Sequence, residues 1–480
     1  MARAQPCGHY ARPVRPARIP RPEPVGHSRL DCARSTLGIV FLHNPIRLIP
    51  LLFLALIASG TALLWLPFAT SAGTSAPLLT AFFTATSAVS VTGLIVVDTP
   101  VYWSMFGQIV ILALFQIGGF GIMTAATLFG LMLGRGFGLT ERMATQVERS
   151  RIERGDAISV IRLVLVLTLC VEALVAAILA VRFHTAHEMG LAAAMWHGIF
   201  HSVSAFNNAG FSTFSNSVMG FQGDGLILAP IMLSVIITAL GFPVMQDIKA
   251  QRLAWRRYTL HTKITLAATA ALLALGFLAT LAMEWANPAT LGPMSLPDKA
   301  LNAAFHAVMP RTAGFNSLDV GSFTDASVMV NYVLMFIGGG SAGTAGGIKL
   351  TTFVVLAAVV ASEILGRRDA GVFQRRFGPQ IERQALSVTV LAATLIFAAT
   401  AFITAISPLP LEEVLFETIS AFSTVGLSRG ITADLPPAAQ IVLCLLMFVG
   451  RVGTITVATA LAVTGRGRAF RYPEENPIVG

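Results

Sequence analysis

The sequence predicts an all-α integral membrane protein, with eight transmembrane helices arranged as four helix–pore loop–helix (M1–P-loop–M2) repeats around a pseudo-fourfold pore. Three observations lead to this fold class: a strongly apolar composition, an alternating distribution of charge, and a glycine motif that occurs four times. Of the 480 residues, 55% are hydrophobic and only 12% are charged, and the mean hydropathy is +0.73. Apolar runs of spanning length recur along the chain, which is typical of a protein solvated by a lipid bilayer.

The net charge of +9 is concentrated between the predicted spans. Of the 33 basic residues, 27 lie in five places: before residue 48, at 135–162, 249–263 and 367–383, and after residue 465. These places alternate with nearly uncharged or mildly acidic loops, which is the positive-inside pattern. The pattern predicts a multi-pass protein of the cell (inner) membrane with both termini in the cytoplasm. It also accounts for the basic balance with no nucleic-acid partner.

Residues 1–37 are rich in arginine and proline and contain almost no apolar run. A segment of this composition cannot bury a core, so we expect a disordered cytoplasmic tail. It also lacks the early apolar stretch of a signal peptide.

A short motif that ends in glycine and a bulky apolar residue occurs at 87–94, 204–211, 308–315 and 420–427. Its glycines, residues 93, 210, 314 and 426, are separated by 117, 104 and 112 residues. A near-constant period implies four copies of one structural unit. We therefore expect repeat 1 at 38–150, repeat 2 at 151–256, repeat 3 at 257–380, and repeat 4 with a short cytoplasmic C-terminus at 381–480.

Each repeat is expected to hold a half-helix between two spans. In repeat 1 the spans lie at about 46–69 and 103–133, and the half-helix at 76–91 is too short to cross a hydrocarbon core about 30 Å thick. The pattern continues with spans at 158–182 and 225–248 around 191–206, spans at 262–285 and 326–364 around 300–310, and spans at 385–406 and 437–463 around 411–422. Eight crossings from a cytoplasmic N-terminus put all four glycine motifs on the outer side.

The glycine turns predict an ion pathway. A cation without its water shell needs oxygen ligands at fixed positions, and backbone carbonyls supply them without the tight binding of a full carboxylate. Glycine permits the positive φ that turns successive carbonyls to one side, and each half-helix points its end dipole at the centre. The predicted ion-selectivity filter consists of Val91, Thr92, Gly93, Leu94, Asn208, Ala209, Gly210, Phe211, Thr312, Ala313, Gly314, Phe315, Thr424, Val425, Gly426 and Leu427.

The fourth turn, Thr-Val-Gly-Leu at 424–427, is close to the start of the potassium-channel filter TVGYG, and the other three turns are degenerate. On these turns the chain resembles the Trk/Ktr/HKT superfamily of potassium transporters, and within it the Ktr-type membrane subunit, over about residues 38–480. The resemblance rests on 84–88, 91–94, 207–211, 311–316, 338–349, 424–427 and 472–475.

The resemblance implies potassium uptake, with K⁺ held by the filter carbonyls, and the Na⁺ dependence that is typical of the Ktr branch. It also implies a homodimer and a cytoplasmic nucleotide-binding RCK-type (KtrA-like) ring subunit that gates transport. Any nucleotide is therefore expected on that partner, and no cofactor is expected on this chain.

A glycine-rich stretch interrupts the sixth predicted span. Six glycines in ten residues do not form a stable helix, at about 1 kcal/mol each relative to alanine. Irregular backbone at membrane depth survives where it lines a cavity or is buried in protein. We therefore predict a flexible gate across the pore, made of Gly338, Gly339, Gly340, Ser341, Ala342, Gly343, Thr344, Ala345, Gly346 and Gly347, together with Lys349 and Arg451.

Arg451, in the eighth predicted span, needs a partner because an unpaired charge in a membrane is costly. We predict that it contacts carbonyls of this loop and helps to hold it closed. A structural ion pair with a glutamate is the alternative.

No cofactor chemistry is predicted from the residues themselves. Gly338, Gly340 and Gly343 satisfy G-x-G-x-x-G, but they lie in a membrane span with no βαβ unit around them. The cysteines have no ligand spacing, which argues against a zinc site or a disulfide framework. They are Cys7, Cys32, Cys170 and Cys444.

Arg311 departs from the repeat pattern, since it puts a positive charge beside the third turn. It either tunes ion occupancy or forms a pair with a carboxylate such as Asp319 or Asp325. Glu172, in the third span, is either a coupling-ion site or, as we favour, hydrogen-bonded to a neighbouring helix.

Two further groups carry open alternatives. His197 and His201 have the spacing of a zinc pair, but we favour a structural pair because no third ligand is near. Three glutamates before the fourth turn could concentrate cations at the outer mouth, or could act on the N-terminus of the half-helix. They are Glu412, Glu413 and Glu417.

Three other functions compete with this interpretation. A Trk-type potassium transporter coupled to protons is disfavoured by the compact eight-span length. A secondary transporter of another solute would show two inverted repeats rather than four copies in one direction. A membrane enzyme is disfavoured because no nucleophile or metal-ligand constellation is present, so the chain is predicted not to be an enzyme.

Overall fold

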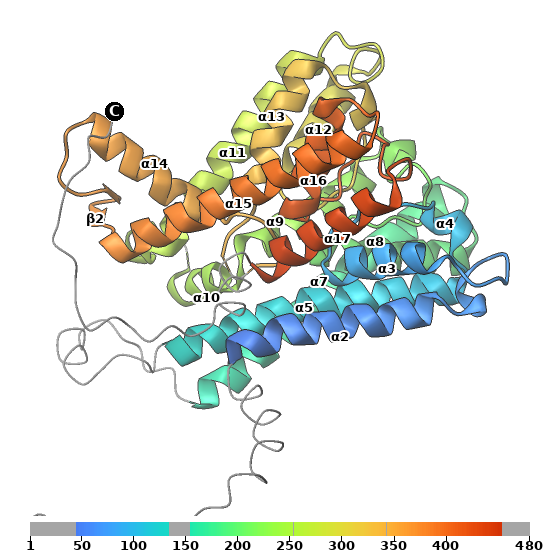
Figure 1. Cartoon of the computed structure of the whole chain (residues 1–480), viewed down its shortest axis with the longest axis horizontal. Coiled ribbons are helices and arrows are strands. Elements are labelled where there is room, and N and C mark those ends of the chain that lie inside the picture. The colour runs from blue at the N-terminus through green and yellow to red at the C-terminus, as the bar shows by residue number, and fades with distance from the viewer. Residues whose placement is uncertain (1–44, 134–153, 253, 342, 454–480) are drawn as a thin grey trace, which may run out of the picture. The chain divides into compact units, whose positions relative to one another are not determined.

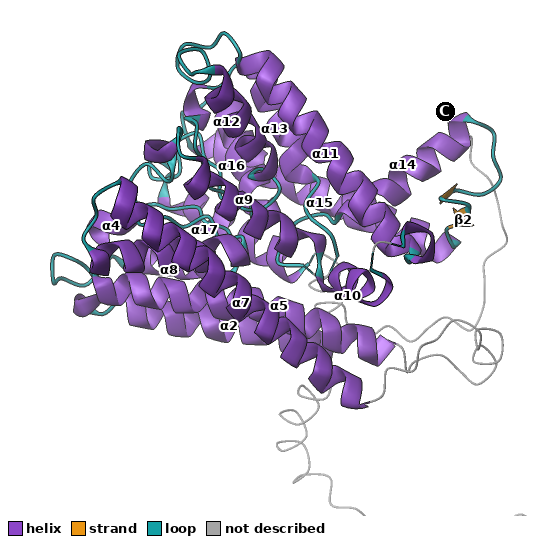
Figure 2. Cartoon of the chain, turned by 180° about the vertical axis from the view of Figure 1, so that it is seen from behind, coloured by secondary structure: helices purple, strands orange, loops and turns teal. Residues whose placement is uncertain are grey.

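The structure is a computed structural model, and it describes residues 45–133, 154–252, 254–341 and 343–453 (Figure 1). The predicted disordered tail, 1–37, and segment 472–475 lie outside these residues. The described part is all-α apart from one two-stranded hairpin (Figure 2), which confirms the all-helical part of the predicted class.

The helices follow one another as the sequence predicts. The first segment holds α2 (Pro45–Leu64), η1 (Pro67–Ala69), α3 (Leu78–Val89), α4 (Thr99–Tyr102) and α5 (Met105–Leu133). The second holds α7 (Arg154–Ala186), α8 (Leu191–Asn207), η2 (Met219–Phe221), α9 (Gly225–Leu240), α10 (Phe242–Gln251) and η3 (Trp255–Arg257). The third holds α11 (Leu260–Glu284), α12 (Leu296–Val308), η4 (Val320–Ser322), α13 (Asp325–Phe336), α14 (Leu350–Ile364), β1 (Gly371–Val372) and β2 (Arg375–Arg376). The fourth holds α15 (Pro379–Ile406), α16 (Leu411–Ser423) and α17 (Pro437–Val452).

The half-helices α3, α8, α12 and α16 begin and end within a few residues of their predicted limits. The largest difference is at α12, which begins at Leu296 rather than near residue 300. Ser295 caps this helix, because its hydroxyl accepts a hydrogen bond from the N–H of Asp298 at 3.4 Å. Pro297 in the first turn has no N–H that would need a partner there.

Helix packing closes the four segments into a cycle. Each half-helix packs against a long helix of its own segment. It also packs against the helix that follows the glycine motif of the neighbouring segment: α8 on α5, α12 on α9, α16 on α13, and α3 on α17. The pair α3–α17 joins the first segment to the last. This arrangement brings the C-terminal ends of the half-helices, and the glycine motifs that follow them, into one region.

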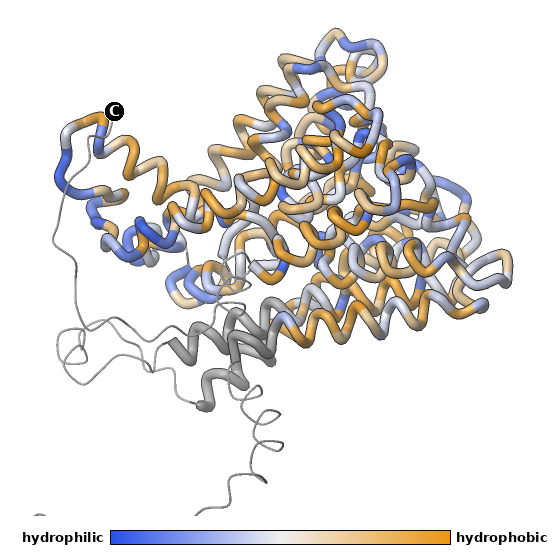
Figure 3. The backbone as a smooth tube through the Cα atoms, viewed as in Figure 1, coloured by the Kyte–Doolittle hydropathy of each residue, from blue (hydrophilic) through white to orange (hydrophobic). Residues whose placement is uncertain are grey.

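Several helices are suited to a membrane. By length and composition, three of those described could cross one: α7 over Val164–Ala186, α11 and α15. The bent pair α9 and α10 makes a fourth if it is counted as one span, and six further apolar helices are shorter. Apolar residues run along the helices while polar residues gather at the connections (Figure 3). The total of eight crossings therefore stays a prediction.

The predicted span at 225–248 is broken into two helices, a break that the sequence analysis did not predict. Helix α9 ends at Leu240 and α10 begins at Phe242, with an angle of 91° between them. Gly241 has a φ of +88°, and a side chain there would collide with the carbonyl of Ser341 in the glycine-rich loop. The bend therefore makes room for that loop. The continuous apolar run on both sides concealed it.

The predicted break in the sixth span is present. Helix α13 ends at Phe336 and α14 begins at Leu350. Ile337 and Ile348 form a single parallel bridge that closes the glycine-rich loop at its base.

Candidate functional site

The four motif glycines lie against one another in a closed ring. A Cβ atom added to Gly93 would lie 3.2 Å from the Cα of Gly210, and one on Gly210 would lie 3.1 Å from the Cα of Gly314. The same construction on Gly314 gives 3.2 Å to Gly426, and on Gly426 gives 3.1 Å to Gly93. Each added Cβ would also strike the carbonyl oxygen of the residue before the next glycine. Only glycine fits at these positions, and four carbonyl-bearing turns surround one point.

The backbone before each glycine is unusual as well. The residue two positions earlier has a left-handed φ in all four turns: +56° at Val91, +59° at Asn208, +77° at Thr312 and +51° at Thr424. The glycines themselves have φ values between +69° and +92°. Non-glycine residues persist in this region only where their surroundings impose it, and such strain clusters at functional sites.

A serine six positions before the glycine holds three of the turns. The carbonyl of Ser87 accepts the N–H of Thr92 at 2.8 Å, and its hydroxyl accepts the N–H of Gly93 at 3.1 Å. Ser420 repeats the hydroxyl contact with Gly426 at 3.1 Å. Ser204 instead donates to the carbonyl of Phe211 at 2.8 Å. These bonds fix the turn to the end of its own half-helix.

The third turn is built differently because Val308 occupies the serine position. Its N–H groups at Ala313 and Gly314 both donate to the carbonyl of Met309, at 3.1 and 3.3 Å. This turn therefore lacks the serine hydroxyl contact of the other three, because the side chain of Val308 has no polar atom.

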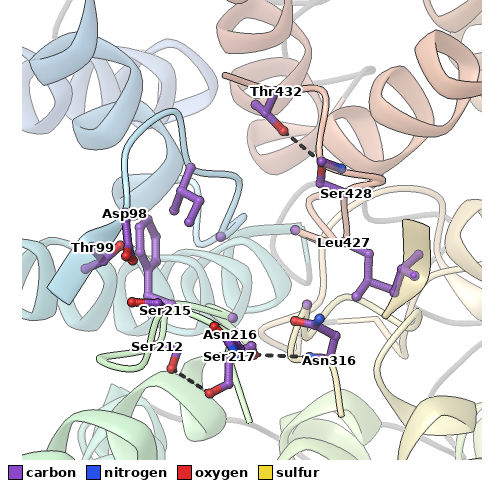
Figure 4. A pocket seen from close by; sticks show the side chains of 18 of the residues that line it. Asp98, Thr99, Ser212, Ser215, Asn216, Ser217, Asn316, Leu427, Ser428 and Thr432 are labelled. Atoms are coloured by element: carbon purple, nitrogen blue, oxygen red, sulfur yellow. Dashed lines mark hydrogen bonds between the residues drawn. The ribbon is translucent and has the colours of Figure 1, made fainter. Parts of the chain in front are cut away.

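The ring opens into a cavity of about 490 Å³ that all four glycines line. Polar side chains from the loops after the turns surround it, including Asp98, Asn216, Asn316, Ser428 and Thr432 (Figure 4). Ser428 and Thr432 are hydrogen-bonded at 3.0 Å, and the N–H of Asn316 donates to the hydroxyl of Ser217 at 3.2 Å. These residues were not among the predicted site residues. Polar residues follow the second, third and fourth motifs directly, which was the available signal, whereas the first motif is followed by the apolar stretch 95–97.

The glycine-rich loop packs against the fourth turn. Side chains on Gly346 and Gly347 would collide with Thr424 and Ser423, respectively. The loop is held by backbone bonds to its surroundings: Gly340 N–H donates to the Ala239 carbonyl at 2.7 Å, and Gly347 N–H donates to the Gly450 carbonyl at 3.3 Å. Ala342 lies outside the described residues. Gly338 also lies against a turn, at Thr312, whereas Gly340 and Gly343 lie against the end of α9.

The contact predicted for Arg451 with this loop is present. Its guanidinium donates to the carbonyl of Thr344, and also to that of Gly118 at 3.4 Å. The side chain is buried, and no ion pair with a glutamate is found for it within the described residues. The ammonium of Lys349 donates to the carbonyl of Ala345 in the same loop.

Arg311 has no carboxylate partner among the described residues, so of the two alternatives the pair with Asp319 or Asp325 was wrong. Its guanidinium lies 3.5 Å from the hydroxyl of Thr269 on α11. Asp319 instead accepts from Ser322 at 2.6 Å, and Asp325 is exposed at the start of α13.

Glu172 lies within hydrogen-bonding range of neighbouring helices, as we favoured. Its carboxylate is 3.4 Å from the amide nitrogen of Gln116 on α5 and 3.5 Å from that of Asn207 at the end of α8. It therefore lies directly behind the second turn.

Both histidines on α8 contact hydroxyl groups. His197 lies 2.6 Å from the hydroxyl of Thr213, and His201 lies 2.9 Å from that of Ser212. These contacts fit the structural role that we favoured, and they tie α8 to the loop after the second turn.

The three glutamates before the fourth turn have different environments. Glu412 forms an ion pair with Arg429 at 3.0 Å. Glu417 is buried and bonded to Ser428 and Thr432 of the cavity wall. Its carboxylate is covered by these two hydroxyls, and its cation-concentrating role stays a prediction.

The chain is similar to known proteins along most of its length. The family model described as "TrkH: Cation transport protein" matches residues 42–472. The chain is 38% identical to the Ktr system potassium uptake protein B of Bacillus subtilis, covering 91% of this chain and 97% of that protein. It is 34% identical to the potassium/sodium uptake protein NtpJ of Enterococcus hirae, with coverage of 91% and 97%. The crystal structure of the potassium transporter TrkH from Vibrio parahaemolyticus matches with a TM-score of 0.67 at 20% identity, covering 92% of this chain and 87% of that one.

Proposed function

The chain belongs to the TrkH family of cation transport proteins, and from this premise we propose that it is the K⁺-conducting membrane subunit of a Ktr-type uptake system. Membership of this family makes the chain a multi-pass membrane transporter and not an enzyme. The relatives named as potassium uptake proteins, which align over nine-tenths of the chain, support K⁺ as the ion.

The closed ring of Gly93, Gly210, Gly314 and Gly426 carries the proposal. Its carbonyls would replace the water shell of K⁺, one quarter of the ring from each repeat of an eight-span, pseudo-fourfold pore. K⁺ would then move inward down its electrochemical gradient, where about 2.3 kcal/mol is available per charge for each 100 mV. With one glycine per turn, the filter should hold fewer ions in series than a filter with the sequence TVGYG. It should also discriminate less sharply between cations.

The glycine-rich loop supports a gate. It packs on the fourth turn, and Arg451 and Lys349 are bonded to its carbonyls. We propose that opening requires the loop to leave the ring, and that the docking of an RCK-type ring subunit controls this step. The name of the Bacillus relative, a component of a Ktr system, supports such an assembly. A homodimer, cytoplasmic termini and Na⁺ dependence complete the proposed scheme.

Rescue of cells tests the function. The chain, co-expressed with a Ktr-type ring subunit, should restore growth of a bacterium without its own K⁺ uptake systems at micromolar K⁺, and Na⁺ should accelerate the uptake. Restored uptake that is insensitive to Na⁺ but follows external protons would favour the Trk-type alternative. No uptake of K⁺ or Rb⁺ under any condition, from protein shown to reach the membrane, would overturn the proposal.

The printed name of the Enterococcus relative, a potassium/sodium uptake protein, supports a second candidate in which the filter also passes Na⁺. Na⁺ uptake without K⁺ in the same cells would distinguish that function from Na⁺-stimulated K⁺ uptake.

A further inference from the structure

The third turn carries a buried positive charge where the others are neutral. Three positions before the glycine, the other repeats have Ser90, Asn207 and Ser423, whereas the third has Arg311. Only 3% of the Arg311 residue surface is exposed. Its backbone is part of the turn, since its N–H donates to the carbonyl of Val308 at 3.1 Å. The third turn itself therefore carries a buried positive charge.

No carboxylate in the described residues neutralises this charge. The contact of the guanidinium with Thr269 is to a neutral hydroxyl at 3.5 Å, and its Nε atom has no partner. Helices α11 and α9 pack against α12, and α9 contains no acidic residue. On α11 the single acidic residue is Glu284, 15 positions after Thr269 and thus about 22 Å along the helix axis.

A buried positive charge opposes the binding of a cation nearby, because the protein interior screens it weakly. Conduction needs an ion to bind strongly enough to enter the filter but weakly enough to leave it. We propose that Arg311 sets this balance: its charge weakens cation binding at the ring of glycines and speeds release. The inference rests on the proposed function, because it concerns the same ion at the same ring.

The test measures the K⁺ concentration that gives half-maximal Rb⁺ flux, in vesicles containing the purified full-length chain. For Arg311→Gln we expect this concentration to fall about tenfold, because removing a weakly screened positive charge strengthens cation binding, and we expect the maximal flux to fall with it. Arg311→Lys keeps the charge and should behave like the wild type.

Two further variants separate charge from packing. Thr269→Glu places a carboxylate beside the guanidinium without removing it, so the half-maximal concentration should also fall. Lys299→Gln is the matched control, because it removes another buried positive charge of the same repeat, which donates to the Trp285 carbonyl at 2.9 Å and lies outside the turn. It should leave the half-maximal concentration unchanged.

A purely structural role gives a different pattern. It would lower the melting temperature of Arg311→Gln and leave the half-maximal concentration of the folded protein within about twofold of the wild type. That result overturns the proposal, as does an unchanged value in Thr269→Glu if Arg311→Gln does not fold. Absence of flux in the wild type would instead count against the proposed function itself.

Discussion

The guanidinium of Arg451 is hydrogen-bonded to the carbonyl of Thr344, a residue 107 positions earlier in the chain. This bond connects the end of α17 to the glycine-rich loop, and a second one connects the same side chain to Gly118 on α5. One buried cation therefore joins elements of the first, third and fourth repeats beside the ring of turns.

We expect Arg451→Gln to weaken closure of this loop. A hydrogen bond from a charged group contributes about 1.5–3 kcal/mol, so its loss should raise the open population roughly tenfold or more. The measurement is K⁺ flux through the membrane subunit alone, without a ring subunit. Lys299→Gln, which removes another buried cation that does not line the cavity, serves as the control. Flux and regulation unchanged in Arg451→Gln would contradict a role in the gate.

Glu417 should support the fourth quarter of the filter from behind. Its carboxylate accepts from the hydroxyls of Ser428 and Thr432, which line the cavity just after the glycine. Glu417→Gln keeps the shape but removes one acceptor, so the loop should loosen and the preference for K⁺ over Na⁺ should fall on the order of threefold. Competition of Na⁺ with Rb⁺ uptake measures this. Glu413→Gln, on the same helix but not buried, should retain the wild-type preference.

Glu284 should stabilise the loops that contain Asn287, Thr290 and Thr324. Its buried carboxylate accepts from Thr324, Thr290 and Asn287 at 2.6–2.9 Å. Glu284→Ala leaves the Thr290 hydroxyl and the Thr324 N–H without this acceptor and should cost about 2–4 kcal/mol of folding free energy. The expected observable is a lower melting temperature in detergent, with the half-maximal K⁺ concentration of the folded fraction unchanged. A wild-type melting temperature would show that the network does not contribute to stability.

Asp224 should make stability depend on acid pH. Burial alone would raise the pKa of Asp224. Hydrogen bonds from Arg182, from His187 and from the N–H of Leu226 have the larger, opposite effect, so the pKa lies below its ordinary value of 3.8. A lowered folded-state pKa means that the carboxylate contributes fully above the ordinary value and loses its contribution as the pH falls through the folded pKa.

Melting temperatures of the wild type and Asp224→Asn between pH 6 and pH 3 test this prediction. The variant should be less stable at pH 6, and the difference should shrink below about pH 4. If the two melting temperatures differed by the same amount at every pH, the ionised form of Asp224 would not be the source of the stabilisation.

The sequence was most informative where one short-range rule decides the structure. The half-helices follow from apolar stretches too short to span, and the break before Leu350 follows from six glycines in ten residues. It was less informative where two distant segments meet. The bend at Gly241 exists because the loop at Ser341 occupies the space that a straight helix would fill.

Partners of buried charges were equally hard to infer. Arg311 contacts a threonine on another helix rather than a nearby aspartate, and Glu417 turns inward to the loop after its own half-helix. Charge and spacing along the chain do not determine which side of a half-helix faces water. Three-dimensional packing decides it.

Rb⁺ uptake by Gly426→Ser in proteoliposomes tests the central claim most directly, namely that the ring of glycines is the ion-selectivity filter. No side chain fits at Gly426, whose added Cβ would collide with the carbonyl of Thr92, whereas Gly220 has open space around it. We predict that Gly426→Ser loses most Rb⁺ uptake or its selectivity over Na⁺, while Gly220→Ala, equally folded, transports like the wild type. Wild-type uptake and selectivity in folded Gly426→Ser would contradict the account.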